Sequence, residues 1–330
     1  MRSRGAVIVC FIVVTAVIAG LVWGPRYGAR APKSTPQKST KISTGATLSS
    51  APSVDARALP RSTLNRNSPL HLREKLRSSR DYAALVRDLT ATVAAGDPEA
   101  EYVSAEALQY CDENLKRFFR LPDGKPRTLP EAQSRWANRP AGYQAEIMDV
   151  YDRCHVFLDD PESAPRTSSW KSLLQRAADS GHPAAEAEEA DLVRAEATLS
   201  GGVIKSDGDD KVLTLDQAKD LALSGAESGD PDALMRMSNW IDPKNRTPEE
   251  YGDLVSAWQI SACQHGYDCD RESDWLRSLC NYDSQCADGD AYVDYFRRHL
   301  GSRFDEVQNL ANEIGAAITS RNSEAIQSHL

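Results

Sequence analysis

The chain has 330 residues, of which 41% are hydrophobic and 26% charged, an ordinary globular composition that suits one large or two small domains. Ten of its 39 basic and one of its 48 acidic residues fall in residues 1–66, which leaves 29 basic and 47 acidic residues, a net charge of −18, for the rest. A body this acidic repels phosphate backbones, so nucleic acid is excluded as an expected partner.

Residues 1–24 resemble a membrane anchor or an export signal. Two arginines precede an uncharged run over residues 5–24, and Arg26 closes it. A spanning helix needs about 20 mostly apolar residues, so the run predicts a single-pass anchor in a bacterial inner membrane. The alternative is a signal peptide cut near the small residues of 17–19, which would release the protein into the periplasm. Apolar residues that continue to Trp23 favour the anchor.

Residues 25–66 are rich in Ser, Thr, Pro, Lys and Arg and have no apolar periodicity. Such a segment buries too little surface to offset the entropy of ordering, so we expect a disordered linker. It would serve as a spacer, with the alternative that its basic residues lie near anionic lipid head groups.

Residues 67–330 follow a helical pattern, and one short phrase recurs in them: AGDPEA (95–100), SGHPAA (180–185) and SGDPDA (228–233). The glycine suits a helix C-terminus, the next polar residue an N-cap, the proline the first helical position, and the alanine a close helix contact. Each phrase therefore predicts a sharp turn between two antiparallel helices. The predicted structural residues are Gly96, Pro98, Ala100, Gly181, Pro183, Ala185, Gly229, Pro231 and Ala233.

Other segments extend this all-α prediction. A weaker fourth corner holds Gly266 without the proline, and residues 140–157 supply an amphipathic helix between the first two corners. TLDQ (214–217) and TPEE (247–250) are capping boxes. Residues 292–300 and 304–319 predict two helices that close the array.

The segments AAGDPEA (94–100), AADSGHPAA (177–185) and GAESGDPDA (225–233) resemble Sel1-like repeats, which are related to the tetratricopeptide repeat. The resemblance implies an α-solenoid that mediates protein–protein contacts, and it implies no enzymatic activity. We expect this helical-repeat domain to cover residues 67–330 and to be stabilised by the disulfides considered next.

Seven cysteines are present, and one of them, Cys10, lies in the apolar run. An even set of six in an exported chain predicts disulfides, whereas the five-residue spacing within the two late pairs suits zinc poorly; free thiols are the third reading. We expect a bridge between two helices and two local bridges. The six residues are Cys111, Cys154, Cys263, Cys269, Cys280 and Cys286.

Signatures of chemistry are weak throughout. The spacing of Ser168 and Lys171 is that of a serine acylase, but the companion motifs are missing and Ser168 suits an N-cap better. His182 and Glu186 could present two metal ligands on one helical face, yet His182 stands in the N-cap position of its corner. We therefore expect no catalytic residue, no bound metal and no cofactor.

The acidic segments and the tryptophans are better explained by structural roles than by a binding site. SDGDD (206–210) and ADGD (287–290) lack the ladder of a calcium-binding loop and predict solvated turns, and EAEEAD (186–191) predicts a solvated helix face. Five tryptophans are core anchors or partner-facing residues, with the core favoured: Trp136, Trp170, Trp240, Trp258 and Trp275.

Taken together, these features predict a membrane-tethered periplasmic scaffold that binds an unknown protein or peptide on the concave surface of its stacked helices. Its acidic surface favours basic or neutral partners. The alternative is a cell-envelope enzyme, or its accessory subunit, that acts on cell-wall material; it would need acidic or Ser/His/Lys groups gathered in a pocket.

Overall fold

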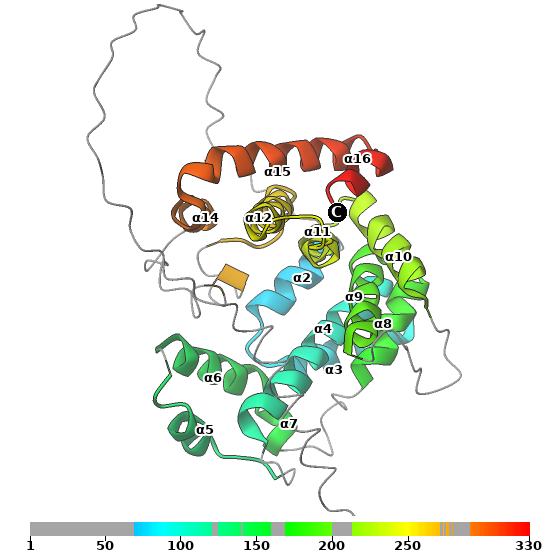
Figure 1. The fold of residues 1–330 in the computed structure, drawn as a ribbon. Coiled ribbons are helices and arrows are strands. Elements are labelled where there is room, and N and C mark those ends of the chain that lie inside the picture. The colour runs from blue at the N-terminus through cyan, green and yellow to red at the C-terminus, as the bar shows by residue number, and fades with distance from the viewer. Residues whose placement is uncertain are drawn as a thin grey trace, which may run out of the picture. The chain divides into compact units, whose positions relative to one another are not determined.

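The structure is a computed structural model, and it describes residues 69–120, 125–139, 141–159, 169–199, 213–270, 273, 275–276, 279 and 291–330. Contacts divide the chain into residues 1–60 and 61–330, and all described residues belong to the second unit. Every regular element among them is helical (Figure 1), which confirms the all-α class. The α-helices are α2 (Pro69–Ser78), α3 (Tyr82–Ala94), α4 (Pro98–Asn114), α5 (Leu129–Arg135), α6 (Ala141–Cys154), α7 (Val156–Asp159), α8 (Trp170–Asp179), α9 (Pro183–Leu199), α10 (Leu215–Glu227), α11 (Pro231–Met237), α12 (Pro248–Gln264), α14 (Tyr292–Leu300), α15 (Phe304–Thr319) and α16 (Ser323–Ser328).

The repeated phrase lies at the turns of three helical hairpins, α3–α4, α8–α9 and α10–α11. The glycine after the first helix of each pair has a positive φ: 78° at Gly96, 78° at Gly181 and 76° at Gly229. Only glycine adopts this left-handed conformation without a steric cost, and it lets the chain reverse directly after the helix.

The next residue of each phrase caps the second helix. Its side chain accepts a hydrogen bond from the backbone N–H three residues later, at 2.9 Å for Asp97, 3.2 Å for His182 through Nδ1, and 3.2 Å for Asp230. The bond satisfies one of the free N–H groups at the start of each helix. Each second helix begins at the proline of the phrase (Pro98, Pro183, Pro231), and each alanine is fully buried (Ala100, Ala185, Ala233).

Two further corners follow the same geometry. Gly266, after α12, has φ 101°. The turn from α15 to α16 has Arg321 at φ 51°, and Asn322 accepts a hydrogen bond from the Ala325 N–H at 3.0 Å. The sequence analysis missed this fifth corner because Arg321 and Ser323 stand where glycine and proline are expected.

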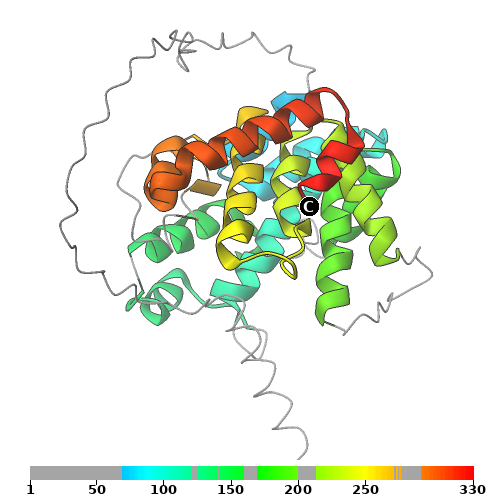
Figure 2. The same cartoon turned by 45° about the horizontal axis from the view of Figure 1, so that its top comes forward.

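Helices of successive hairpins are in contact: α4 with α8, α9 with α10 and α11, α11 with α12, and α12 with α15. The two late helices, α14 and α15, have the bounds that the sequence predicts. In both views of the fold, α15 and α16 lie over the edge formed by α10 and α12 (Figures 1 and 2).

The closest helix approach is at Gly225 of α10. A Cβ atom there would stand 2.7 Å from the Pro183 carbonyl oxygen and 3.2 Å from the Cβ of Ala233. Hence α10 packs against the first turns of both α9 and α11, and only a hydrogen atom fits between them.

Two disulfides are formed among the described cysteines. Cys111 and Cys154 join α4 to α6, with Cα atoms 5.5 Å apart, and Cys263 and Cys269 close a loop at the end of α12, with Cα atoms 5.6 Å apart. These are two of the expected bridges. Cys280 and Cys286 lie outside the described residues.

Several sequence predictions also fall outside the described residues. They concern the anchor (1–24), the linker (25–66), Ser168 and the acidic segments 206–210 and 287–290. Among the helices that are described, none is both long enough and apolar enough to cross a membrane.

Candidate functional site

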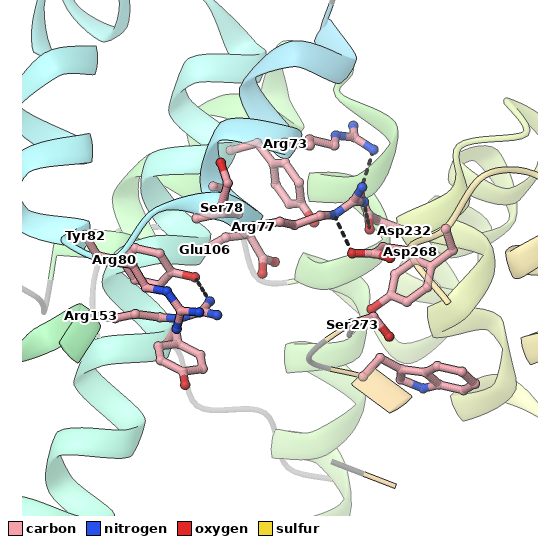
Figure 3. A pocket seen from close by; sticks show the side chains of 15 residues that line it. Arg73, Arg77, Ser78, Arg80, Tyr82, Glu106, Arg153, Asp232, Asp268 and Ser273 are labelled. Atoms are coloured by element: carbon pink, nitrogen blue, oxygen red, sulfur yellow. Dashed lines mark hydrogen bonds and ion pairs between the residues drawn. The ribbon is translucent and has the colours of Figure 1, made fainter. Parts of the chain in front are cut away.

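A cavity of about 670 Å³ lies in the described part of the chain (Figure 3). Its walls come from α2, α3, α4, α6, α11 and the segment that follows α12. A second space of about 300 Å³ adjoins it on the side of α11 and α12. The two spaces share five lining residues: Tyr102, Glu106, Asp232, Tyr267 and Trp275.

The upper wall of the cavity is organised around Arg73 of α2. Its guanidinium lies 2.9 Å from Glu99, 2.8 Å from Asp230 and 2.6 Å from Asp232. Glu99 belongs to the first repeated phrase and the two aspartates to the third, so a single arginine joins two corners that are far apart in the sequence. The Arg73 side chain is only 6% exposed, so this network of ion pairs is buried and largely shielded from water.

The second repeated phrase (180–185) also contacts this network, through His182. His182 Nε2 lies 2.7 Å from Glu99 Oε2, while its Nδ1 accepts the capping hydrogen bond described above. Nε2 also lies 3.2 Å from Arg73 Nη2, so the ring touches both members of the Arg73–Glu99 ion pair. Tyr102 stacks on the ring at 4.6 Å, and the Arg73 guanidinium lies 5.3 Å from the Tyr102 ring centre. All three corners thus meet beside the cavity.

A second arginine, the half-buried Arg236 of α11, stands between two carboxyl groups. Its Nη2 lies 3.0 Å from Glu106 and 3.1 Å from Glu188. Burial raises the pKa of Glu188 well above its ordinary value against the charge of Arg236, and Glu106 adds to the rise. Burial alone would also raise the pKa of Glu106, but the hydrogen bond with Glu188 and the charge of Arg236 lower it overall. The two pKa values are therefore pushed apart, and Glu188 is the member of the pair that is more easily protonated.

This geometry corrects one sequence prediction. The run EAEEAD (186–191) is not a solvated face, because Glu188 is 2% exposed and bound to Arg236. The helix that carries the run, α9, contacts α8, α10 and α11, so most of its circumference is covered.

The opposite wall has a third arginine centre. Arg153 of α6 donates to the Tyr82 hydroxyl at 2.6 Å and lies 3.0 Å from Asp149, which also accepts from the Tyr110 hydroxyl at 3.0 Å. Burial, followed by the charge of Asp149, raises the pKa of Tyr110. Figure 3 shows Arg153 and Tyr82 on one side of the cavity and Asp232 and Asp268 on the other.

The remaining wall comes from the loop that the Cys263–Cys269 disulfide closes. Tyr267 and Asp268 lie inside this loop and both line the cavity, and Tyr267 meets Trp275 edge to face at 6.3 Å. A short covalent loop holds these side chains at the cavity without help from a helix.

The structure separates the five tryptophans that the sequence left undecided. Trp170, Trp240 and Trp258 are buried in the core, whereas Trp275 lines the cavity and Trp136 is half-buried between arginines on the other side of the fold.

The predicted site residues and the cavity overlap little. The corner residues position the walls, and the cavity chemistry comes from Arg73, Glu106, Arg153, Asp232 and Arg236, none of which the sequence singled out. Of these five, only Asp232 has a local signal: it occupies the variable position of the phrase, which is acidic in the first and third copies. In the part of the chain that is described, no three His, Cys, Asp or Glu side chains are grouped to hold a metal ion.

Comparisons of this chain with protein-family models, with curated proteins and with solved structures find no match. The functional argument therefore rests on the residues of this chain alone.

Proposed function

We propose that residues 67–330 form an α-solenoid of degenerate Sel1-like hairpins and act as a non-catalytic scaffold that binds a protein or peptide segment in the cavity. The observation that supports this most is the build of the cavity walls. The buried Arg73 and Arg153 and the half-buried Arg236 are each fixed by carboxyl or hydroxyl groups, so the polar atoms around the cavity are already oriented before any partner arrives. Such preorganisation lowers the entropic cost of binding.

The composition of the lining supports a peptide rather than a purely apolar ligand. Tyrosine and tryptophan give large contact areas at low entropic cost, and carboxyl and guanidinium groups match backbone and side-chain polar groups. A cavity of about 670 Å³ has room for a few residues of an extended segment.

We further propose that this scaffold works in the bacterial periplasm, with residues 1–24 as its inner-membrane anchor or as a cleaved signal. Two disulfides in one small helical domain support an oxidising compartment.

Site-specific crosslinking in cells tests the scaffold. A photoreactive phenylalanine derivative in place of Tyr267 should yield a reproducible crosslinked partner, because that side chain lines the cavity. The matched control places the same group at Leu215, an exposed apolar residue at the start of α10, away from the cavity. Identical products from both positions, or no product from Tyr267, would contradict a partner in the cavity.

The enzyme alternative keeps one supporting feature, the opposite pKa shifts of the neighbouring Glu106 and Glu188, with Glu106 on the cavity wall. Two carboxyl groups with separated pKa values can serve as acid and base. Incubation with purified bacterial cell-wall polymer would distinguish the readings: release of fragments that is lost in Glu106→Gln would favour the enzyme, and no release would favour the scaffold.

A further inference from the structure

The junction between the two spaces of the cavity has a distinctive set of side chains. Its five shared residues are three aromatic rings and two carboxyl groups: Tyr102, Tyr267, Trp275, Glu106 and Asp232. Aromatic faces attract cations through their quadrupole, and carboxylates do so through their charge. The Tyr102 ring already has His182 and Arg73 against it, so the attraction for a ligand cation comes from Tyr267, Trp275 and the two carboxyl groups.

Charge is unbalanced around this junction. Arg73 and Arg236 are the two guanidinium groups that lie about 3 Å or less from carboxyl groups here, and five carboxyl groups contact them. The carboxyl groups therefore outnumber these two guanidinium groups. Burial raises the pKa of Asp232 although Arg73 opposes the rise. Burial also raises the pKa of Tyr267, and the charges of Asp232 and Glu106 add to that rise while Arg236 and Arg77 oppose it. These directions agree with a negative potential at the junction.

One further cation of the protein only partly offsets this potential. Arg77 of α2 approaches Asp232 and Asp268 to no less than 4.0 Å, and its side chain is 35% exposed. Figure 3 shows it extending across the cavity toward both carboxyl groups. At that distance the attraction is weak and screened, so a better-placed ligand cation can displace it.

We propose that this junction is a subsite for the cationic side chain, lysine or arginine, of the segment that the cavity binds. The inference rests on the proposed function and adds the chemistry of the ligand. At the junction itself an anionic group would meet Glu106 and Asp232, while the guanidinium of Arg73 is buried and that of Arg236 already bridges two carboxyl groups.

Small probes test the subsite without knowledge of the partner. The full chain is titrated with Nα-acetyl-lysine amide and with Nα-acetyl-norleucine amide, which has a similar shape and no charge. The readout is the indole N–H resonance of Trp275 in the NMR spectrum, identified by its loss in Trp275→Phe. The lysine probe should shift this resonance saturably, and norleucine should bind at least about five-fold more weakly, as expected for a cation held by aromatic and carboxylate groups. Equal binding of the two probes would overturn the subsite.

Two substitutions should move the lysine affinity in opposite directions. Glu106→Gln removes a wall charge and should weaken binding about five-fold or more, whereas Arg77→Gln removes the competing cation and should strengthen it about two- to five-fold. Glu306→Gln on α15 and Arg87→Gln on α3, both exposed and away from the cavity, make the same charge changes and should leave the affinity unchanged. Arg77→Gln provides the test even if Glu106→Gln is unstable, and weaker lysine binding in Arg77→Gln would contradict the proposal.

The outcomes also separate this inference from the proposed function. Crosslinks from Tyr267 together with charge-independent probe binding would retain the scaffold and remove the subsite. Charge-dependent binding of the lysine probe without any crosslinked partner would retain the subsite and remove the scaffold.

Discussion

At the scale of single residues, the molecule depends on charged groups that are buried and paired. Arg73, Arg153 and Arg236 are each held by two or more acceptors close to the cavity. Removing one member of such a group leaves the others buried and unpaired, which typically costs about 3–5 kcal/mol. The same groups orient the cavity wall, so stability and the proposed binding share residues.

Glu188 carries a testable dependence on pH. Its pKa is raised in the folded protein, so the folded state binds the proton more tightly than the unfolded state. The stabilisation that this gives is complete below the ordinary glutamate pKa of about 4.3 and is lost as the pH rises through the raised value. Glu188→Gln keeps a neutral side chain at every pH, so the variant should not lose this stabilisation as the pH rises from the ordinary glutamate pKa through the raised one. At pH 8 the variant should exceed the native protein by about 1 kcal/mol or more in free energy of unfolding.

Urea denaturation at a series of pH values checks this prediction. The exposed Glu74 of α2 supplies the control, since Glu74→Gln should leave the pH dependence of the native protein in place. A difference between Glu188→Gln and the native protein that is constant from pH 4 to pH 8 would contradict a raised pKa at Glu188.

The error over residues 186–191 has a cause at this scale. A run of acids with alanines suggests water on one face when only the helix itself is considered. The burial of Glu188 depends on Arg236, which lies 48 residues later, and on three neighbouring helices. No short segment contains that information.

At the scale of the helices, the elements that sequence could predict are those decided by neighbours within a few residues. The turns at Gly96, Gly181 and Gly229 and the capping boxes at Thr214 and Thr247 all depend on hydrogen bonds across three to five residues. A third capping box, at Thr128 before α5, has the same local signal in TLPE and was overlooked. The cavity could not be predicted, because its walls come from elements that only packing brings together.

The contact of α10 with α9 and α11 leads to a prediction about two glycines in helix interiors. Gly225→Ala places a methyl group 2.7 Å from the Pro183 carbonyl and should destabilise the protein by about 1–3 kcal/mol. Gly252→Ala in α12 meets nothing within 4 Å and should stabilise it by about 0.5–1 kcal/mol through helix propensity. Thermal and urea denaturation measure both, and effects of the same sign would argue against the tight packing at Gly225.

At the scale of the whole described unit, the two disulfides constrain loops of very different length. The bridge from α4 to α6 spans 43 residues and ties the α5–α6 region to the stacked hairpins, whereas the bridge after α12 spans 6. In the chain-entropy model these loops correspond to about 4 and about 2 kcal/mol.

Paired serine substitutions test both bridges. Cys111→Ser with Cys154→Ser should lower the free energy of unfolding by more than Cys263→Ser with Cys269→Ser, since it frees the longer loop. The second pair should instead weaken lysine-probe binding more, because Tyr267 and Asp268 lie inside that loop. The reverse order in either measurement would contradict these assignments.

In the repeated phrase, the residue between the proline and the alanine has no role in the turn, so its identity is free to vary. It is Glu99 in the first copy, Ala184 in the second and Asp232 in the third, and only the two acids reach Arg73. If the hairpins assembled in another order, Ala184 would face this arginine and a buried charge would lack its partner. The residue at this position therefore distinguishes three hairpins whose turns are nearly identical. A packing order that placed Ala184 against Arg73 would be less stable, because the arginine would lose a carboxylate partner.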